Sequence, residues 1–248
     1  MSSDTSISAS TSASAAKQTK RNIGFTVLII VVVISVFIAL VFNRILQPRI
    51  LSKDDLMTNG AIIFDQPRIV KDFALIDQDG QPFSKNDLEG KWTMLFYGFT
   101  QCPDICPMTL LQINQVIEKL DPNIREQVQV GLVTLDPARD TPELLKQYVA
   151  SFNPDYFALT GDFLEILKFA RNVNVAFTKV PLGKASSGST SESASNPKVA
   201  DNYTIDHTGN IVLLNPYGDY HGFFKPPFEL AKLKLTLSSV VQKGVPDR

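Results

Sequence analysis

The sequence predicts an α/β domain with a mixed β-sheet, flanking helices and extra β-hairpins, preceded by one transmembrane helix. Strand-like segments alternate along the chain with segments that repeat apolar residues at helical spacing, which is typical of an α/β layer. Turn signals between short apolar segments indicate hairpins at both ends of the domain. A run of twenty uncharged residues close to the N-terminus indicates the membrane helix.

The uncharged run extends from residue 23 to residue 42. A helix of this length spans about 30 Å, which matches the hydrocarbon core of a bilayer. The run exceeds the roughly 7–15 apolar residues of a cleaved signal peptide, and no A-x-A-like site follows it, so we expect an uncleaved signal anchor. Residues 1–22 are expected to be a disordered cytoplasmic tail. The chain is therefore predicted to cross a bacterial inner membrane once, with its C-terminal domain in the periplasm.

The rest of the chain is divided by its patterns into a linker that leads into the domain (43–71), the domain itself (72–242) and a tail (243–248). A Ser-rich stretch at about 183–200 predicts a low-complexity loop inside the domain. The expected elements are, in order, a hairpin over 73–83 turned at Asp79-Gly80, a strand over 91–99, a helix over 107–120, a strand over 128–135, a helix opening at Thr141-Pro142-Glu143, a strand over 156–159, a helix over 161–172, a hairpin of 203–205 and 211–214, a strand over 219–224 and a helix over 227–242.

Net charge and residue counts exclude several kinds of site. The net charge of −1 leaves no basic footprint for nucleic acid. The chain has only two cysteines and two histidines, so a zinc site of four thiolates cannot form within it. Both cysteines lie in one motif, which excludes a scattered disulfide framework. Any metal site must therefore use few protein ligands.

Cys102 and Cys106 follow the predicted strand 91–99 and stand four residues apart at the start of a predicted helix. On a helical turn this spacing places the Cα atoms about 6 Å apart, within reach of a disulfide. Pro107 suits the first helical position, so Cys106 is predicted to be the N-cap, where free N–H groups lower the pKa of a thiol. Two converging thiolates would select Cu(I) or zinc. A purely structural disulfide is the alternative, although so small a loop adds little stability.

A copper ion held by two thiolates commonly takes one further ligand, and imidazole is a frequent one. His207, at the end of a predicted strand, is one candidate, and His221, beside the second arm of a hairpin, is the other. Their positions in the sequence leave the choice between them open.

Three short motifs occur in order along the domain. They are C-P-D-I-C-P at residues 102–107, L-D-P-A-R-D-T-P at residues 135–142 and D-H-T at residues 206–208. Together, in this order and spacing, they resemble the Sco/SenC family of copper chaperones for cytochrome c oxidase assembly, and the likeness extends over roughly residues 72–241. The resemblance implies a thioredoxin-like fold with extra hairpins and a bound copper ion.

The resemblance also implies that Cys102, Cys106 and His207 are the copper ligands, which favours His207 over His221. The implied function is delivery of copper to the CuA site of cytochrome c oxidase subunit II. Because oxidation of the two thiols to a disulfide would remove two ligands, copper loading and redox state would be coupled.

Asp136, Arg139 and Asp140 belong to the second motif, and the first two are candidates for supporting the site. Arg139 would stabilise thiolate charge, whereas helix capping by Asp140 or Thr141 is an equally good interpretation of the motif. Asp206 would fix the tautomer of the neighbouring histidine.

Other functions use the same two cysteines. A thiol–disulfide reductase that keeps acceptor cysteines reduced would need both cysteines but not His207. Peroxiredoxin-like peroxide reduction and a redox or copper sensor without turnover are further alternatives. The sequence therefore leaves open whether the protein is a metallochaperone or also an oxidoreductase.

Overall fold

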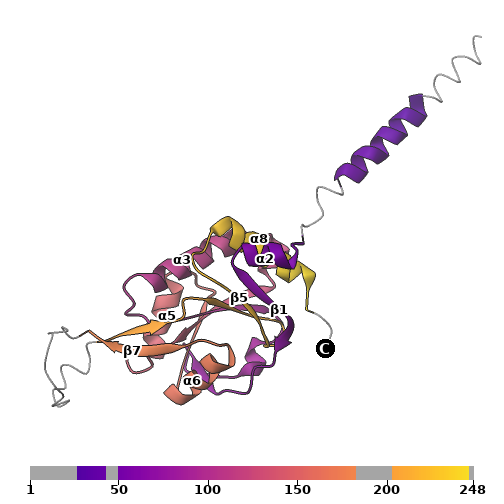
Figure 1. The fold of residues 1–248 in the computed structure, drawn as a ribbon. Coiled ribbons are helices and arrows are strands. Elements are labelled where there is room, and N and C mark those ends of the chain that lie inside the picture. The colour runs from indigo at the N-terminus through magenta and orange to yellow at the C-terminus, as the bar shows by residue number, and fades with distance from the viewer. Residues whose placement is uncertain (1–26, 43–49, 183–202, 246–248) are drawn as a thin grey trace, which may run out of the picture. The chain divides into compact units, whose positions relative to one another are not determined.

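The computed structural model describes the chain in three stretches, namely residues 27–42, 50–182 and 203–245 (Figure 1). Contacts between residues divide the chain into two units, residues 1–49 and residues 50–248.

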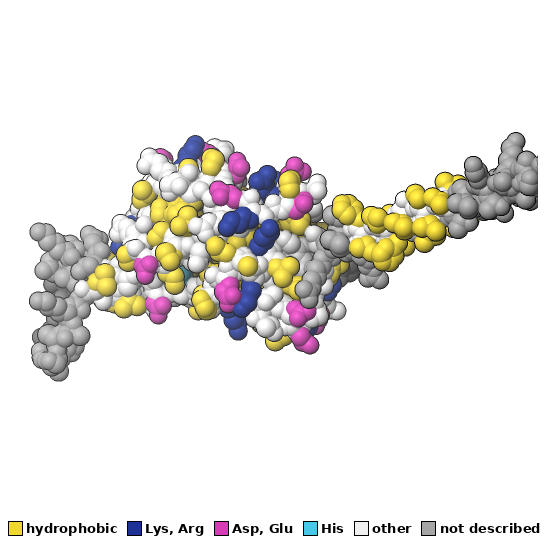
Figure 2. All heavy atoms as spheres, turned by 90° about the horizontal axis from the view of Figure 1, so that it is seen from above, with side chains coloured by type: hydrophobic (Ala, Val, Ile, Leu, Met, Phe, Trp, Pro, Cys, Tyr) yellow, Lys and Arg dark blue, Asp and Glu magenta, His cyan; other side chains and the backbone are white. Residues whose placement is uncertain are grey.

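The first unit contains an α-helix over residues 27–42. Its apolar side chains are exposed, and Figure 2 shows them along the visible side of the helix. Within the described ranges, none of the helices is both long and apolar enough to cross a membrane. The predicted tail 1–22 and residues 23–26 of the predicted span lie outside the described residues.

In its described residues, the second unit combines helices with two β-sheets. Its helices are α2 (Lys53–Thr58), α3 (Ile105–Glu118), α4 (Pro122–Arg125), α5 (Pro142–Ala150), α6 (Phe163–Asn172) and α8 (Leu230–Lys243), and η1 (Lys85–Leu88) is a 3-10 turn. Its strands are β1 (Ala61–Arg68), β2 (Leu75–Asp77), β3 (Pro82–Phe83), β4 (Trp92–Gly98), β5 (Val128–Thr134), β6 (Phe157–Thr160), β7 (Phe177–Pro181), β8 (Tyr203–His207), β9 (Ile211–Leu214) and β10 (Tyr220–Phe224).

The larger sheet has eight strands in the order β1-β10-β9-β4-β5-β6-β2-β3. Strand β4 lies near its centre, parallel to β5 and antiparallel to β9. All seven residues of β4 are buried, because helices cover both faces of the sheet. Strand β5 is in turn parallel to β6, so the carboxyl ends of β4, β5 and β6 meet at one edge of the sheet.

Helices α3 and α8 pack together over one face of this sheet, and α6 lies on the opposite face (Figure 1). The ring of Tyr97 on β4 lies 6.0 Å from that of Phe169 on α6. Successive side chains of a strand point to opposite faces, so Phe96 and Gly98 face α3. The residues after the carboxyl end of β4 therefore connect the buried centre of the sheet directly to α3.

Capping side chains begin two helices where the sequence predicted them. The hydroxyl of Thr141 accepts a hydrogen bond from the N–H of Leu144, and Pro142 occupies the first helical position of α5. The carboxylate of Asp162 accepts one from the N–H of Leu164 at the start of α6. The first predicted hairpin is confirmed as β2 and β3, which pair in antiparallel fashion.

Strands β7 and β8 form a separate two-stranded antiparallel sheet, which is called the β7–β8 hairpin below. The predicted hairpin of residues 203–205 and 211–214 is therefore wrong, since β8 pairs with β7 whereas β9 pairs with β4 and β10. The error arises because β7 is largely exposed and precedes the predicted low-complexity loop, so that its pattern does not stand out. That loop, residues 183–200, lies outside the described residues.

The start of the compact unit also differs from the predicted boundary at residue 72. Strand β1 pairs with β10 at the edge of the larger sheet, and α2 packs against β1. The N–H of Leu51 donates a hydrogen bond to Ser239 on α8, with an N–O distance of 2.7 Å. Residues 50–71, which were expected to lead into the domain, are thus part of it.

Candidate metal and thiol site

The cysteine loop, residues 99–104, joins the carboxyl end of β4 to α3. Helix α3 begins at Ile105 with Asp104 as its N-cap, so the predicted N-cap position of Cys106 is wrong. Pro107 occupies the third helical position instead of the first, which is tolerated because the first N–H groups of a helix have no intrahelical partner. Cys106 nevertheless lies in the first turn, where the positive end of the helix dipole acts.

The two thiols have different surroundings, and both are free. Cys106 is fully buried, whereas Cys102 is partly exposed at the surface of the domain. The sulfur of Cys102 accepts a hydrogen bond from the N–H of Cys106 at 3.4 Å. A Cβ atom at Gly98 would lie 3.0 Å from Cys106 Sγ, so the missing side chain at Gly98 makes room for this sulfur.

His207 ends β8 and reaches the cysteine loop from the β7–β8 hairpin. Its Nε2 atom lies 3.9 Å from Cys106 Sγ, and its ring packs edge-on against Phe96 and Phe99. Its Nδ1 atom lies 3.1 Å from the carbonyl oxygen of Thr208. A carbonyl can only accept a hydrogen bond, so this contact places the ring proton on Nδ1 and leaves the lone pair of Nε2 facing the sulfur.

Two thiols and one imidazole thus converge at the carboxyl end of the central strand. For comparison, bonds from zinc to sulfur and to nitrogen are about 2.3 and 2.0 Å long, so one ion can reach both atoms across a gap of up to roughly 4.3 Å. The 3.9 Å between Cys106 Sγ and His207 Nε2 lies inside this limit. In the described part of the chain, however, no three His, Cys, Asp or Glu side chains are already close enough together to hold a metal ion. The donor types fit a soft metal, and binding would draw the three side chains together.

The pKa values of the two thiols move in opposite directions. The hydrogen bond from the Cys106 thiol lowers the pKa of Cys102 to about 4, helped by backbone N–H groups and against the opposing effect of burial. The same hydrogen bond and burial raise the pKa of Cys106. Cys102 is therefore the thiolate of the pair, and Cys106 keeps its proton.

This asymmetry predicts selective alkylation. In the reduced, metal-free protein, Cys102 is expected to react with iodoacetamide at pH 6 about 10-fold or more faster than Cys106, because only Cys102 is a partly exposed thiolate at that pH. The alkylation rate of Cys102 is expected to fall only as the pH approaches about 4, because its thiolate becomes protonated there. Peptide mapping of the briefly alkylated parent protein by mass spectrometry gives the label on each cysteine, and faster labelling of Cys106 would contradict the assignment.

The other predicted support residues lie in the loop after β5. The guanidinium of Arg139 bonds Asp136, the side chain of Gln101 and the carbonyl of Tyr203, so its contacts are with the loops around the site. The carboxylate of Asp140 accepts hydrogen bonds from the backbone and hydroxyl groups of Thr100 in the cysteine loop. Helix α5 is capped by Thr141, so the capping interpretation holds for that residue, whereas Asp140 holds the cysteine loop.

Asp206 and His221 were the other two candidates related to the histidine ligand. Asp206 does not hold the ring of His207, because neighbouring residues of a strand point to opposite faces and Nδ1 contacts Thr208 instead. His221 is buried, with its ring 4.9 Å from that of Trp92. Trp92 begins β4, and the cysteine loop follows its other end, about 20 Å away at 3.3 Å per residue. The structure therefore brings His207, and not His221, to the cysteines.

Sequence reasoning missed Tyr203 and Gln101, which contact Arg139 beside the site. Tyr203 also donates a hydrogen bond to the buried carboxylate of Asp136, with an O–O distance of 2.6 Å. In the sequence, Tyr203 lies in the strand of His207 and Gln101 directly precedes Cys102, but no spacing rule links either residue to the loop after β5.

The domain is similar to solved structures of Sco proteins. Copper-bound Sco1 of yeast matches with a TM-score of 0.60 and 28% identity, covering 73% of this chain and 92% of that one. Copper-bound ScoI of Arabidopsis thaliana matches with a TM-score of 0.58 and 30% identity, covering 71% and 99%. These likenesses confirm the thioredoxin-like mixed α/β sheet with helices and a hairpin.

Sequence relatives agree with the structural ones. An SCO2-like protein of Rickettsia prowazekii is 31% identical over 195 residues, which cover 79% of this chain and 88% of the relative. The mitochondrial SCO2 homologue of Mus musculus is 37% identical over 157 residues, which cover 61% and 55%. The family described as SCO1/SenC matches residues 64–242, well over half of the chain. By this match, which includes both cysteines and the histidine that the fold brings to them, the chain belongs to the SCO1/SenC family.

Proposed function

We propose that this protein binds a copper ion through Cys102, Cys106 and His207. The observation that carries the proposal is the convergence of two thiols and an imidazole lone pair, with Cys106 Sγ and His207 Nε2 3.9 Å apart. Thiolate ligands select Cu(I) over hard cations. The copper-bound structures of yeast Sco1 and Arabidopsis ScoI support the choice of copper.

The proposed role of this copper is transfer to the CuA site of cytochrome c oxidase subunit II. Membership of the SCO1/SenC family supports a role in oxidase assembly. The burial pattern supports transfer, because Cys102 is partly exposed while Cys106 is enclosed. An incoming thiolate of an acceptor would therefore meet Cys102 first, and the ion would move by exchange of one soft ligand for another. The copper is thus a cargo, and the protein is its carrier.

Copper titration of the reduced full-length protein tests the ligand set. The parent is expected to bind one Cu(I) per chain, and His207→Ala is expected to weaken binding by about 10-fold or more, since loss of even a supporting group costs a metal site that much. A His221→Ala variant is the matched control, because this histidine lies at the other end of β4. Equal affinities of the parent and His207→Ala would show that His207 is not a ligand.

A thiol–disulfide reductase is the second candidate, and the opposite pKa shifts of the two thiols favour it. A partly exposed thiolate beside a buried protonated thiol is the arrangement in which Cys102 attacks a substrate disulfide and Cys106 resolves the mixed disulfide. The two products are a reduced substrate and a Cys102–Cys106 disulfide. Reduction by this route does not use His207 as a metal ligand.

The variant His207→Ala therefore separates the two functions. If copper delivery is the function, His207→Ala is expected to lose oxidase assembly in cells while still reducing a model disulfide in vitro. Oxidase activity in membranes and the rate of disulfide reduction are the two measurements. Full oxidase assembly with this variant would favour reductase chemistry over copper delivery.

The proposed location is a bacterial inner membrane, with residues 23–42 as a single span and the copper domain in the periplasm. The uncharged run supports a membrane span at residues 23–42. Fusions of a periplasm-dependent reporter enzyme to residue 245 test it. The periplasm-dependent reporter is expected to be active. If it is inactive and a cytoplasm-dependent reporter fused at the same residue is active, the domain lies in the cytoplasm.

A further inference from the structure

The β7–β8 hairpin, which carries His207, forms its own sheet and pairs with none of the described strands of the larger sheet. Most residues of both strands are exposed or partly exposed, and Ile205 is the only described residue of the hairpin strands that is buried. Main-chain pairing therefore does not fix where β8 lies relative to the cysteine loop. Besides the short chain connection from β8 to β9, side-chain contacts hold β8 against the cysteine loop.

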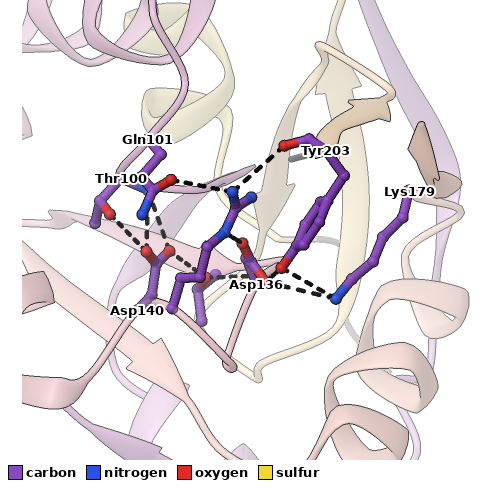
Figure 3. A network of polar contacts seen from close by, with 8 residues as sticks. Thr100, Gln101, Asp136, Asp140, Lys179 and Tyr203 are labelled. Atoms are coloured by element: carbon purple, nitrogen blue, oxygen red, sulfur yellow. Dashed lines mark hydrogen bonds and ion pairs between the residues drawn. The ribbon is translucent and has the colours of Figure 1, made fainter. Parts of the chain in front are cut away.

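Arg139 contacts three segments, namely the cysteine loop, the start of β8 and the loop after β5. Its Nη1 atom donates to the side-chain oxygen of Gln101 at 3.0 Å and to the carbonyl oxygen of Tyr203 at 3.3 Å. Gln101 directly precedes Cys102, and Tyr203 begins β8, so one guanidinium holds the cysteine loop and the histidine strand together (Figure 3). Its Nε atom donates to the carboxylate of Asp136, which fixes the guanidinium to the loop after β5.

Tyr203 is held on three sides. Its hydroxyl donates to Asp136 Oδ1 at 2.6 Å, the centre of the Arg139 guanidinium lies 3.8 Å from its ring centroid, and Lys179 Nζ lies 4.4 Å from the same centroid. Lys179 belongs to β7 and lies 3.6 Å from Asp136 Oδ1, so both strands of the hairpin reach one carboxylate. Asp136 is fully buried, and a buried charge is stable only while such partners remain in place.

We propose that Asp136, Arg139 and Tyr203 are positioning residues that hold β8 so that His207 faces the cysteines. The effect of these residues on copper affinity rests on the proposed copper site. The placement of the His207 ring does not, because it is a property of the copper-free protein. The planar fork of Arg139 is essential to it, because one lysine ammonium cannot bond Asp136, Gln101 and the Tyr203 carbonyl in the same geometry. The variant Arg139→Lys keeps the charge and loses the fork.

The two histidine rings allow a direct test, because the chain has no others. In NMR spectra of the reduced, copper-free protein, Arg139→Lys and the milder Tyr203→Phe are expected to shift or broaden the ring signals of His207 and leave those of His221 unchanged. His221 lies against Trp92 at the other end of β4, so it reports any general loss of structure. Unchanged His207 signals, or equal changes in both rings, would overturn the proposal. Arg125→Lys, an exposed arginine on α4, is the matched control and should change neither ring.

A double-mutant cycle then measures the consequence for copper. Arg139→Lys is expected to lower Cu(I) affinity about 10-fold in the parent, as loss of a supporting group does at other metal sites, and to cause no further loss in the His207→Ala background. Equal losses in both backgrounds would show that Arg139 does not act through His207. If His207→Ala alone leaves copper affinity unchanged, the proposed ligand set is wrong, and the NMR result still decides whether Arg139 positions the ring.

Discussion

Replacing Cys102 or Cys106 with serine is expected to lower the affinity for Cu(I) by more than about 100-fold. Loss of a supporting group costs a metal site 10–100-fold, and each serine removes a direct soft ligand and offers a hard hydroxyl instead. The two losses should be similar, because the remaining thiolate and His207 cannot replace the missing sulfur. Competition with a chromogenic Cu(I) chelator, under reducing and anaerobic conditions, measures the affinity of each variant.

Met108 supplies the control for this experiment. It is an exposed residue of α3, two positions after Cys106, and its thioether is the nearest other soft donor in the sequence. Met108→Leu is expected to leave copper affinity unchanged. Parent-like binding by Cys102→Ser, or a loss in Met108→Leu as large as in the cysteine variants, would show that the proposed ligand set is wrong. Because Cys106 is buried, the stability of Cys106→Ser must be measured alongside, so that unfolding is not taken for loss of a ligand.

The parts of the fold that could be predicted from the sequence are those whose signals are local. Capping by Thr141 and Asp162, the apolar run of β4 and the turn at Asp79-Gly80 each lie within a few residues of the element that they define. Cys102 and Cys106 were likewise identifiable as a reactive pair, because their spacing and the following helix are local features. Such signals can predict a single turn, helix or strand, but not which elements contact each other.

The parts that could not be predicted depend on contacts between distant segments. The partner of β8 is β7, and nothing local to residues 203–207 distinguishes it from β9, which follows more closely in the sequence.

The same limit applies to His207, which was chosen over His221 by family resemblance alone. The structure supplies the physical reason, since Phe96, Phe99 and Cys106 surround one histidine and Trp92 covers the other. Arg139 has its role for the same reason, because Gln101 and Tyr203 meet only in the folded chain.

The second large effect concerns His221 and the stability of the fold. Burial, together with the positive charge of Lys243, lowers the pKa of His221 to about 4. In the unfolded chain, a histidine takes up its proton near pH 6.5. The folded state therefore binds fewer protons than the unfolded state between these values. The stability that this difference contributes is fully present above pH 6.5 and is lost as the pH falls towards 4.

With 1.36 kcal/mol per pKa unit, the parent is expected to lose about 3 kcal/mol through His221 between pH 7 and pH 4. His221→Phe removes the titrating ring but keeps an aromatic side chain against Trp92, so its loss over the same range should be smaller by that amount. Other groups that titrate in this range are common to both proteins and cancel in the difference. Urea denaturation followed by the fluorescence of Trp92, the single tryptophan, gives both free energies of unfolding. Equal losses in parent and variant would mean that His221 is protonated in the folded protein as readily as in the unfolded chain, and that its burial beside Trp92 does not keep it neutral.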